Sequence, residues 1–248
     1  MLRPITTESG NRFAGLIIGQ AGIGKTSLLR TIMGQDFNPQ TGTWTQVENP
    51  IGRVCVLSAE SGLLCVRDLI QSGHIEGFEI GSLQELKEAL QTLSHPDSQK
   101  KYQWVFIDSL TEIASRCVEV MKAKYPDRKD SFPMWGEYAD TMTALIKALR
   151  DMSAYNVVFS CLDAIDKDEI NRRFVGPDIA GNGLKQRLPS YFDEVLYYTT
   201  ITTEQGLPYR VFICQPTDKF QAKDRSGKLS QIEKPCLRNI YSKIIGGN

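Results

Sequence analysis

The sequence predicts an α/β protein built on a doubly wound, mostly parallel sheet. Short apolar runs typical of buried strands alternate with helix-like runs, and a glycine-rich loop joins the first strand to the first helix. Two apolar runs near the carboxyl end predict an antiparallel extension at one edge of the sheet. We expect a single domain over residues 1–248, with a short amino-terminal extension over 1–12.

The composition limits the class of protein. Lys plus Arg and Asp plus Glu both number 29, so there is no overall positive field, and contact with nucleic acid must depend on a local patch. The six cysteines form no C-x-x-C pair, and neither a secretory signal nor a membrane-length apolar run is present. We therefore expect reduced thiols, a cytoplasmic location and no contact with a membrane.

The elements follow one another along the chain. Strands are expected at 13–18, 53–58, 103–108, 155–161, 194–200 and 209–214, with a short one at 78–80. Helices are expected at 27–33, up to about 71, at 83–93, 109–124 and 136–153. Connections are expected at 34–52, with an extended piece around 43–47, at 94–101 and at 125–134. A long loop at 162–183, rich in Asp, Gly and Arg, is expected to be mobile and functional.

The glycine-rich loop carries the strongest functional signal. It fits G-x-x-x-x-G-K-[ST], and its context of strand before and helix after is that of the phosphate-binding loop of P-loop NTPases. Its residues are Gly19, Gln20, Ala21, Gly22, Ile23, Gly24, Lys25 and Thr26, with Ser27 following. Backbone amides there hold phosphate oxygens, the Lys25 ammonium contacts the β- and γ-phosphates, and the Thr26 hydroxyl binds Mg²⁺. A nucleotide and Mg²⁺ are thus the expected cofactors.

A second motif lies downstream of the phosphate loop. The apolar run 103–108 ends in Asp108, which is typical of a Walker B strand whose carboxylate holds Mg²⁺ beside Thr26. Hydrolysis also needs a group that orients water, and the residue after Asp108 is Ser109 rather than Glu. Glu60 is the candidate, because it stands just beyond the end of strand 53–58 at the ligand-binding edge. Glu112 is a weaker alternative.

These motifs resemble the RecA-type ATPase core. In that family the catalytic glutamate follows the strand after the P-loop helix, the position of Glu60. The segment 222–227 resembles the K-x-R-x-G segment of RadA, KaiC and DnaB-type proteins. That resemblance implies that Lys223 and Arg225 reach across a subunit interface to the neighbour's γ-phosphate. It further implies head-to-tail self-association, as a ring or a filament, with ATP at the interfaces.

The chain is also similar to compact phage RecA-like proteins described as phage nucleotide-binding or AAA-domain ATPases. The similarity covers residues 12 to 245 and includes the core-only length and the run Phe192-Asp193-Glu194-Val195 before a late strand. It implies a role in phage recombination and single-strand annealing inside a bacterial host. Single-stranded DNA and a single-strand-binding protein are the implied partners.

Two regions depart from this pattern or leave it open. RecA-type proteins carry Gln or His as a polar sensor where this chain has Ser160 and Cys161, so either Ser160 does a reduced version of that task or sensing differs. The loop 162–183 falls where RecA-type proteins contact DNA. Candidate phosphate contacts are Arg172, Arg173, Lys185 and Arg187, with Phe174 for stacking, whereas Asp163, Asp166, Asp168, Glu169 and Asp178 oppose a phosphate backbone.

Other functions share the same phosphate loop. A ring motor, either a helicase or a packaging-type ATPase, would need ATP-driven translocation. A nucleotide-gated switch that binds a protein partner would hydrolyse slowly and ignore DNA, and a small-molecule kinase would need a lid with several arginines. No N-K-x-D motif for guanine is present, so ATP rests on the resemblance.

Overall fold

The computed structural model describes residues 12–60, 62–126, 131–167, 171–202, 204 and 206–246. The strands of its main sheet are β1 Ala14–Gly19, β4 Val54–Ser58, β5 Ile75–Glu79, β6 Trp104–Asp108, β7 Asn156–Cys161, β10 Glu194–Thr202, β11 Pro208–Ile213, β12 Lys223–Asp224 and β13 Ile232–Glu233. Six of them run parallel in the order β5–β4–β6–β7–β1–β10. Antiparallel β11 and β13 extend the sheet beyond β10, which also pairs with β12. The predicted fold class, including its antiparallel edge, is confirmed.

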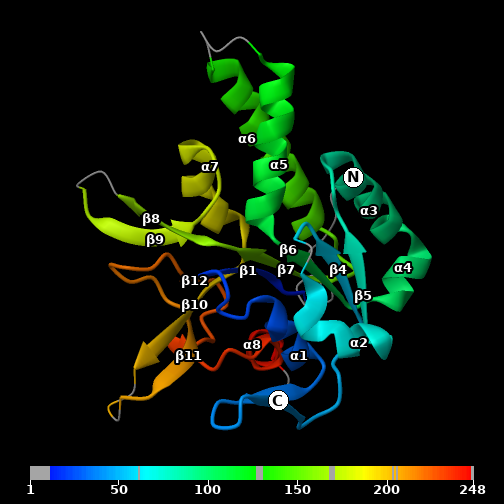
Figure 1. The fold of residues 1–248 in the computed structure, drawn as a ribbon, viewed down its shortest axis with the longest axis vertical. Helices are drawn as coiled ribbons and strands as arrows, with labels where there is room; N and C mark the ends of the chain where they lie inside the picture. Colours follow the sequence, from blue (N-terminus) through cyan, green and yellow to red (C-terminus); the bar gives the residue numbers. More distant parts are fainter. Residues whose placement is uncertain are drawn as a thin grey trace.

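Helices cover both faces of this sheet (Figure 1). On one face lie α3 Leu83–Ser94, α5 Leu110–Lys124 and α6 Phe132–Arg150, and on the other lie α1 Leu29–Ile32, α2 Arg67–Gln71 and α8 Leu237–Ile245. The central strands are buried on both faces, which is why they are continuous apolar runs in the sequence. Two separate apolar clusters result, one on each face. None of the described helices combines the length and apolar character that a membrane crossing requires.

Several connections contain more regular structure than the sequence predicts. The connection at 34–52 holds a hairpin of β2 Gln35–Asn38 and β3 Thr43–Gln46, of which only the second strand is expected. The supposed polar loop at 94–101 contains α4 Pro96–Lys101. Proline at its first position and lysines in its last turn are helix signals that the high polarity of the segment hides. Helix α6 likewise begins at Phe132, before the expected 136, with proline in its first turn.

The prediction that 162–183 is a long loop without regular structure is wrong where the structure describes it. Strands β8 Asp163–Lys167 and β9 Arg173–Pro177 form an antiparallel hairpin, followed by α7 Asn182–Arg187. The Val175 amide donates to the Lys219 carbonyl at 2.6 Å, so a distant segment supports the hairpin. Neither strand has a fully apolar face, and a period-two pattern is therefore missing from the sequence. Residues 168–170, including the predicted Asp168 and Glu169, lie outside the described part.

The carboxyl-terminal helix α8 closes the face on which α1 lies, and the sequence reading does not anticipate it. Its buried side chains are Leu237, Arg238 and Ile240. The first amide of the helix, at Leu237, donates to the buried Thr31 hydroxyl at 2.9 Å, and this side chain of α1 satisfies an otherwise orphan donor. Helix α8 thereby anchors the short helix that follows the phosphate loop.

We expect Leu237→Ala to lower the free energy of unfolding by about 2–5 kcal/mol, because it opens a cavity at a fully buried position. Urea unfolding measures the change. The matched control is Ser242→Ala on the exposed face of the same helix, which should stay within about 0.5 kcal/mol of the parent. Equal effects of the two substitutions would contradict the packing role of α8.

Candidate functional site

The phosphate loop lies at the carboxyl end of β1, between that strand and the 3₁₀ turn Thr26–Leu28 that leads into α1. Gly22 and Gly24 adopt φ values of 74° and 104°, which side chains rarely permit. The Lys25 ammonium folds back over the loop, donating to the carbonyls of Gly19 at 2.7 Å and Gln20 at 2.9 Å. These residues form a cradle of backbone groups with one cation inside it.

Lys25 is buried, with 8% of its surface exposed. Burial lowers the pKa of its ammonium, and the negative charges of Asp108 and Glu60 partly oppose that shift. Among the carboxylates that act on Lys25, Asp108 contributes most and Glu60 comes next. A cation held in this way is matched to an anionic ligand.

Asp108 ends β6 next to the loop, as the sequence predicts, and is 3% exposed. Its Oδ2 accepts from the Thr26 hydroxyl at 2.6 Å, and its Oδ1 accepts from the Ser160 hydroxyl at 2.5 Å. Burial raises the pKa of Asp108, although both hydroxyl donors act in the opposite direction. Ser160, the candidate γ-phosphate sensor, therefore contacts the carboxylate of Asp108.

The Thr26 hydroxyl and the Asp108 carboxylate fit a magnesium site. Mg²⁺ prefers oxygen ligands and is usually bound by one or two protein groups, with phosphates and water completing the octahedron. The two oxygens already touch at one edge of the cradle. Among the described residues no group of three or more His, Cys, Asp or Glu side chains could hold a metal by itself, so an ion here would need phosphate oxygens as further ligands.

Glu60 stands just after β4 and joins the same constellation. Its backbone amide donates to the Asp108 carbonyl at 3.3 Å, and its carboxylate accepts from the Ser109 hydroxyl. Arg116 of α5 supports this turn by donating to the carbonyls of Ala59 at 2.8 Å and Gly81 at 2.6 Å. Glu60 is exposed, and the Ser109 hydroxyl holds its carboxylate while Arg116 holds the backbone beside it.

Glu112, the alternative candidate, is engaged elsewhere. Its carboxylate lies 3.3 Å from the Arg116 guanidinium, one turn along α5. Neither Lys25 nor Asp108 has Glu112 among the charges that perturb its pKa, whereas Glu60 acts on both. The geometry favours Glu60 as the group that faces the phosphate cradle.

The Lys223–Arg225 segment lies at the other end of β10. Asp224 pairs with Glu194, which in turn pairs with Gly15, whereas the phosphate loop starts beside Tyr198. Four residues of strand separate the two levels, or about 13 Å. Lys223 donates to the Phe192 carbonyl at 2.6 Å, and Arg225 pairs with Asp193 at 2.5 Å while its side chain stays 56% exposed. Neither cation faces the phosphate loop of its own chain.

Residues that sequence reasoning missed border the loop on the β11 side. A Cβ atom placed on Gly24 would lie 3.4 Å from the Arg210 guanidinium and 3.8 Å from the Tyr198 hydroxyl. The Arg210 guanidinium also lies 5.5 Å from the centre of the Phe37 ring. No short motif marks these positions. The available signal is aromatic side chains, Phe37 and Trp44, in a connection otherwise rich in Gly, Pro and Thr.

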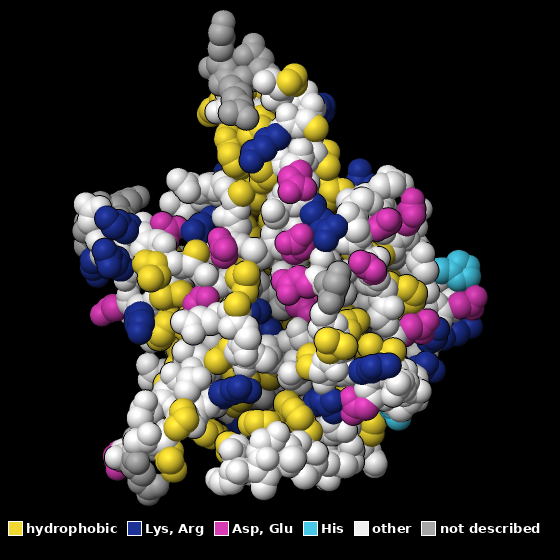
Figure 2. Space-filling view, viewed as in Figure 1, with side chains coloured by type: hydrophobic (Ala, Val, Ile, Leu, Met, Phe, Trp, Pro, Cys, Tyr) yellow, Lys and Arg dark blue, Asp and Glu magenta, His cyan; other side chains and the backbone are white. Residues whose placement is uncertain are grey.

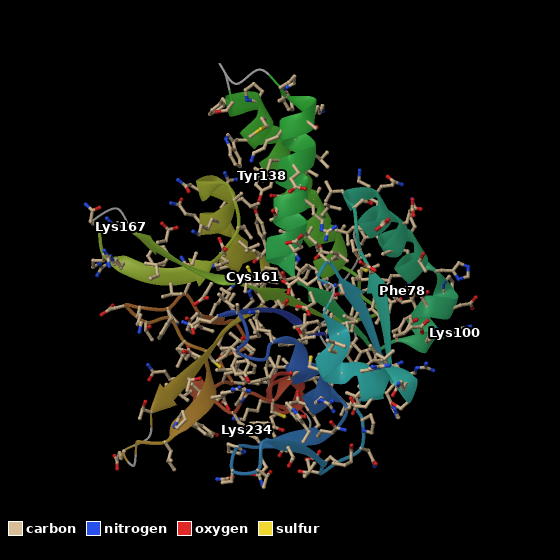
Figure 3. The ribbon with its side chains drawn as sticks, in the orientation of Figure 1. Phe78, Lys100, Tyr138, Cys161, Lys167 and Lys234 are labelled. Carbon is tan, nitrogen blue, oxygen red and sulfur yellow. The ribbon has the colours of Figure 1, made fainter. Side chains whose placement is uncertain are left out.

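A cavity of about 390 Å³ opens behind Arg210. Its walls come from the β2–β3 hairpin, the ends of β10 and β11, and the segment before α8. They include Phe37, Trp44, Tyr198, Tyr209, Arg210 and Lys234. Figure 3 places Lys234 beside the hairpin, where its ammonium bonds Asp36 at 2.6 Å. We call this cavity the aromatic pocket.

The predicted DNA-contacting residues lie on and after the β8–β9 hairpin. Arg173 and Arg187 are exposed, whereas Lys185 is partly buried and pairs with Asp166 at 3.2 Å. The Asp163 carboxylate accepts from the Tyr197 hydroxyl at 2.8 Å. Two of the opposing acids are therefore engaged within the chain. Lys167, at the outer end of β8, adds an exposed cation (Figure 3).

Comparisons place these features among known proteins. A family model described as AAA domain matches residues 12–226. The chain is similar to the RadB recombinase, with 13% identity over 86% of this chain and 92% of that one and a TM-score of 0.42. It is also similar to the flagellar accessory protein FlaH from Methanocaldococcus jannaschii, with 10% identity over 80% of this chain and 76% of that one and a TM-score of 0.42. No curated protein matches it. Since the family model spans most of its length, the chain belongs to the AAA domain family.

Proposed function

We propose that this protein is a Mg²⁺-dependent, RecA-like ATPase. The observation that carries the proposal is the meeting of Lys25, Thr26, Asp108 and Glu60 at one edge of the sheet, where three strands, β1, β6 and β4, end. Phosphoryl transfer to water requires a cation, a hydroxyl–carboxylate pair and a second carboxylate. The family match to an AAA domain supports the same class.

In this proposal each group has one task. The loop amides and the Lys25 ammonium hold the β- and γ-phosphates, with Lys25 exchanging its two carbonyl partners for phosphate oxygens. Thr26 and Asp108 would hold Mg²⁺, which supplies charge neutralisation on the phosphates. The exposed Glu60 carboxylate orients the attacking water, and Ser109 fixes that carboxylate in place.

The aromatic pocket is the proposed site of the nucleobase. It lies next to the loop, because Arg210 contacts both Gly24 and the Phe37 ring. A cavity of about 390 Å³ with aromatic walls suits a flat heterocycle, and Phe37 and Trp44 pack with ring centres 5.3 Å apart. The Arg210 guanidinium would then sit between the phosphates and the base.

Assembly is proposed to be head-to-tail. Arg225 lies far from its own phosphate loop, and its exposed guanidinium is free to exchange Asp193 for a phosphate of a neighbouring subunit. Lys223 would have to leave two backbone carbonyls to do the same, so Arg225 is the better candidate for the group that acts in trans. A contact of this heterologous kind makes a ring or a filament.

Single-stranded DNA is the proposed partner, in phage recombination. The hairpin β8–β9 leaves the sheet just after Cys161, at the edge where the phosphate loop lies, and Lys and Arg side chains gather over it in Figure 2. Exposed Lys167, Arg173 and Arg187 supply the phosphate contacts. Nucleotide state and DNA contact would be coupled through this shared edge.

Lys25→Ala should abolish nucleotide binding, because it removes the cation from the cradle. Glu60→Gln should still bind ATP while turnover falls by about 10²- to 10⁴-fold, the usual contribution of a positioned general base. Binding is measured by titration calorimetry and turnover by phosphate release. Glu112→Gln is the matched control, and a loss of turnover in that variant with normal turnover in Glu60→Gln would reverse the assignment.

Phe37→Ala should weaken ADP binding by roughly 5- to 150-fold, because stacking of a base on an aromatic ring is worth about 1–3 kcal/mol. Pyrophosphate, which lacks a base, should bind the variant and the parent equally. ADP should also quench the fluorescence of Trp44, and Trp44→Phe should remove that signal. Equal losses for ADP and pyrophosphate would place the base outside the aromatic pocket.

Arg225→Ala and Lys25→Ala should each be inactive alone, yet a mixture of the two should regain hydrolysis. In a head-to-tail pair, the intact Arg225 of one variant completes the nucleotide site of the other. Turnover should also rise with protein concentration and with single-stranded DNA. Lys122→Ala, an exposed substitution with the same charge change on α5, is the control. Normal turnover of Arg225→Ala alone, or a mixture that stays inactive, would refute action in trans.

A further inference from the structure

Two carboxyl groups meet beneath the segment that carries Arg225. Glu194, the first residue of β10, is fully buried, and its direct partner across the antiparallel pair is Asp224. Its Oε1 accepts from the Ser226 amide at 3.2 Å. No donor among the described residues reaches its Oε2, which is also buried. A buried acceptor without a donor costs free energy, so this atom needs an explanation.

Asp224 cannot supply a donor while it is ionised, but its carboxylate lies within hydrogen-bond reach of Glu194 and also accepts from the surrounding turn. Its Oδ1 accepts from the Ser226 hydroxyl at 2.6 Å and the Gly227 amide at 2.8 Å. Its Oδ2 accepts from the Leu229 amide at 2.9 Å and the Gln215 amide nitrogen at 3.2 Å. Burial raises the pKa of Asp224, but these donors outweigh it and the net effect is a lowered pKa. Asp224 is therefore the ionised centre of the turn 223–229.

The surrounding charges do not neutralise Glu194. The groups that face it are Asp193, Asp224 and Cys214, together with the cations Lys223 and Arg225. Both cations are committed, Lys223 to the Phe192 carbonyl and Arg225 to Asp193. Burial and the adjacent Asp224 charge raise the pKa of Glu194 to about 8.

We propose that Glu194 is a positioning residue that stays protonated at neutral pH and donates its proton to Asp224, clasping the turn 223–229 against β10. The clasp fixes the backbone from which Arg225 extends, and this consequence for turnover rests on the proposed action of Arg225 in trans. The proton satisfies the orphan Oε2 and removes the repulsion between the buried Glu194 carboxylate and the half-buried Asp224 carboxylate. Loss of the proton releases the turn.

The Glu194 proton makes the stability of the folded protein decrease as the pH rises. The pKa of Glu194 is about 8 in the folded protein and 4.5 for an ordinary glutamate in the unfolded chain, so the native protein keeps a proton that the unfolded chain loses. The stabilising contribution is complete below pH 4.5 and is lost progressively as the pH rises to about 8. Glu194→Gln replaces the neutral acid by a permanently neutral donor of the same shape and removes this dependence.

The first test compares thermal unfolding of the parent and Glu194→Gln between pH 5 and pH 9. The two should unfold together near pH 5, and the glutamine variant should become the more stable by several degrees at pH 8 to 9. The control Glu233→Gln removes a buried acid whose pKa is lowered overall, because hydrogen bonds from Lys243 and Ser230 outweigh its burial. It should be less stable than the parent by a constant amount across this range.

A constant deficit of Glu194→Gln at all pH values, or its failure to fold, would overturn the clasp, since a neutral acid tolerates an amide in its place. Infrared difference spectra of the parent between pH 6.5 and 9.5 give an answer that needs no folded variant. They should show the loss of a protonated carboxyl band, and its absence contradicts the proposal.

The second test follows turnover. For a group with a pKa of about 8, the protonated fraction falls about tenfold between pH 7 and pH 9. Turnover that depends on Arg225 should fall in parallel in the parent and stay level in Glu194→Gln. If both fall alike, the positioning role is wrong. If neither hydrolyses ATP at any pH, the proposed ATPase function fails, while the unfolding and infrared measurements still decide the clasp.

Discussion

Asp108 joins the ends of three neighbouring strands, β4, β6 and β7, to the phosphate loop. Its carboxylate accepts from Thr26 at the end of the phosphate loop and from Ser160 on β7, and its carbonyl accepts the amides of Ala59 and Glu60 after β4. A buried carboxylate is costly unless such donors surround it. The Thr26 bond that stabilises the charge therefore also holds the phosphate loop, and the backbone carbonyl of the same residue holds Glu60. Asp108 is at once a structural junction and the acidic centre of the candidate site.

The sequence is most informative where function and fold require the same residues. The loop 19–26 needs glycines for its backbone and Lys25 for phosphate, and the buried parallel strands need uninterrupted apolar runs, so both are legible along the chain. The order in which strands end also predicts that Asp108 and Glu60 approach each other, because carboxyl ends of parallel strands share one edge. The structure places these residues together as that argument requires.

The features that the sequence does not predict depend on contacts between distant segments. The hairpin β8–β9 is supported by the segment around Lys219, and α8 is capped by Thr31, more than 200 residues earlier in the chain. Arg210 reaches the phosphate loop only because β10 pairs with β1 on one side and with β11 on the other. A pattern within one short stretch of sequence carries no information about contacts with such distant segments. The short helix α4 was missed for a different reason, since its end signals are present but it has no buried side chain to give a periodic pattern.

Strand β10 explains how one chain could supply both halves of a shared nucleotide site. Halfway along it, Tyr198 lies against the phosphate loop beside Arg210, and at its amino end Glu194 underlies the turn that carries Arg225. The strand keeps Tyr198 and Glu194 apart, which places Arg225 away from the phosphate loop of its own chain, as the proposed action in trans requires. The sheet fixes the distance between Tyr198 and Glu194. The turn 223–229 over Glu194 sets the direction in which the Arg225 side chain extends. In such an arrangement the sheet sets the spacing of an assembly, and the protonation of one buried carboxyl adjusts the contact that completes it.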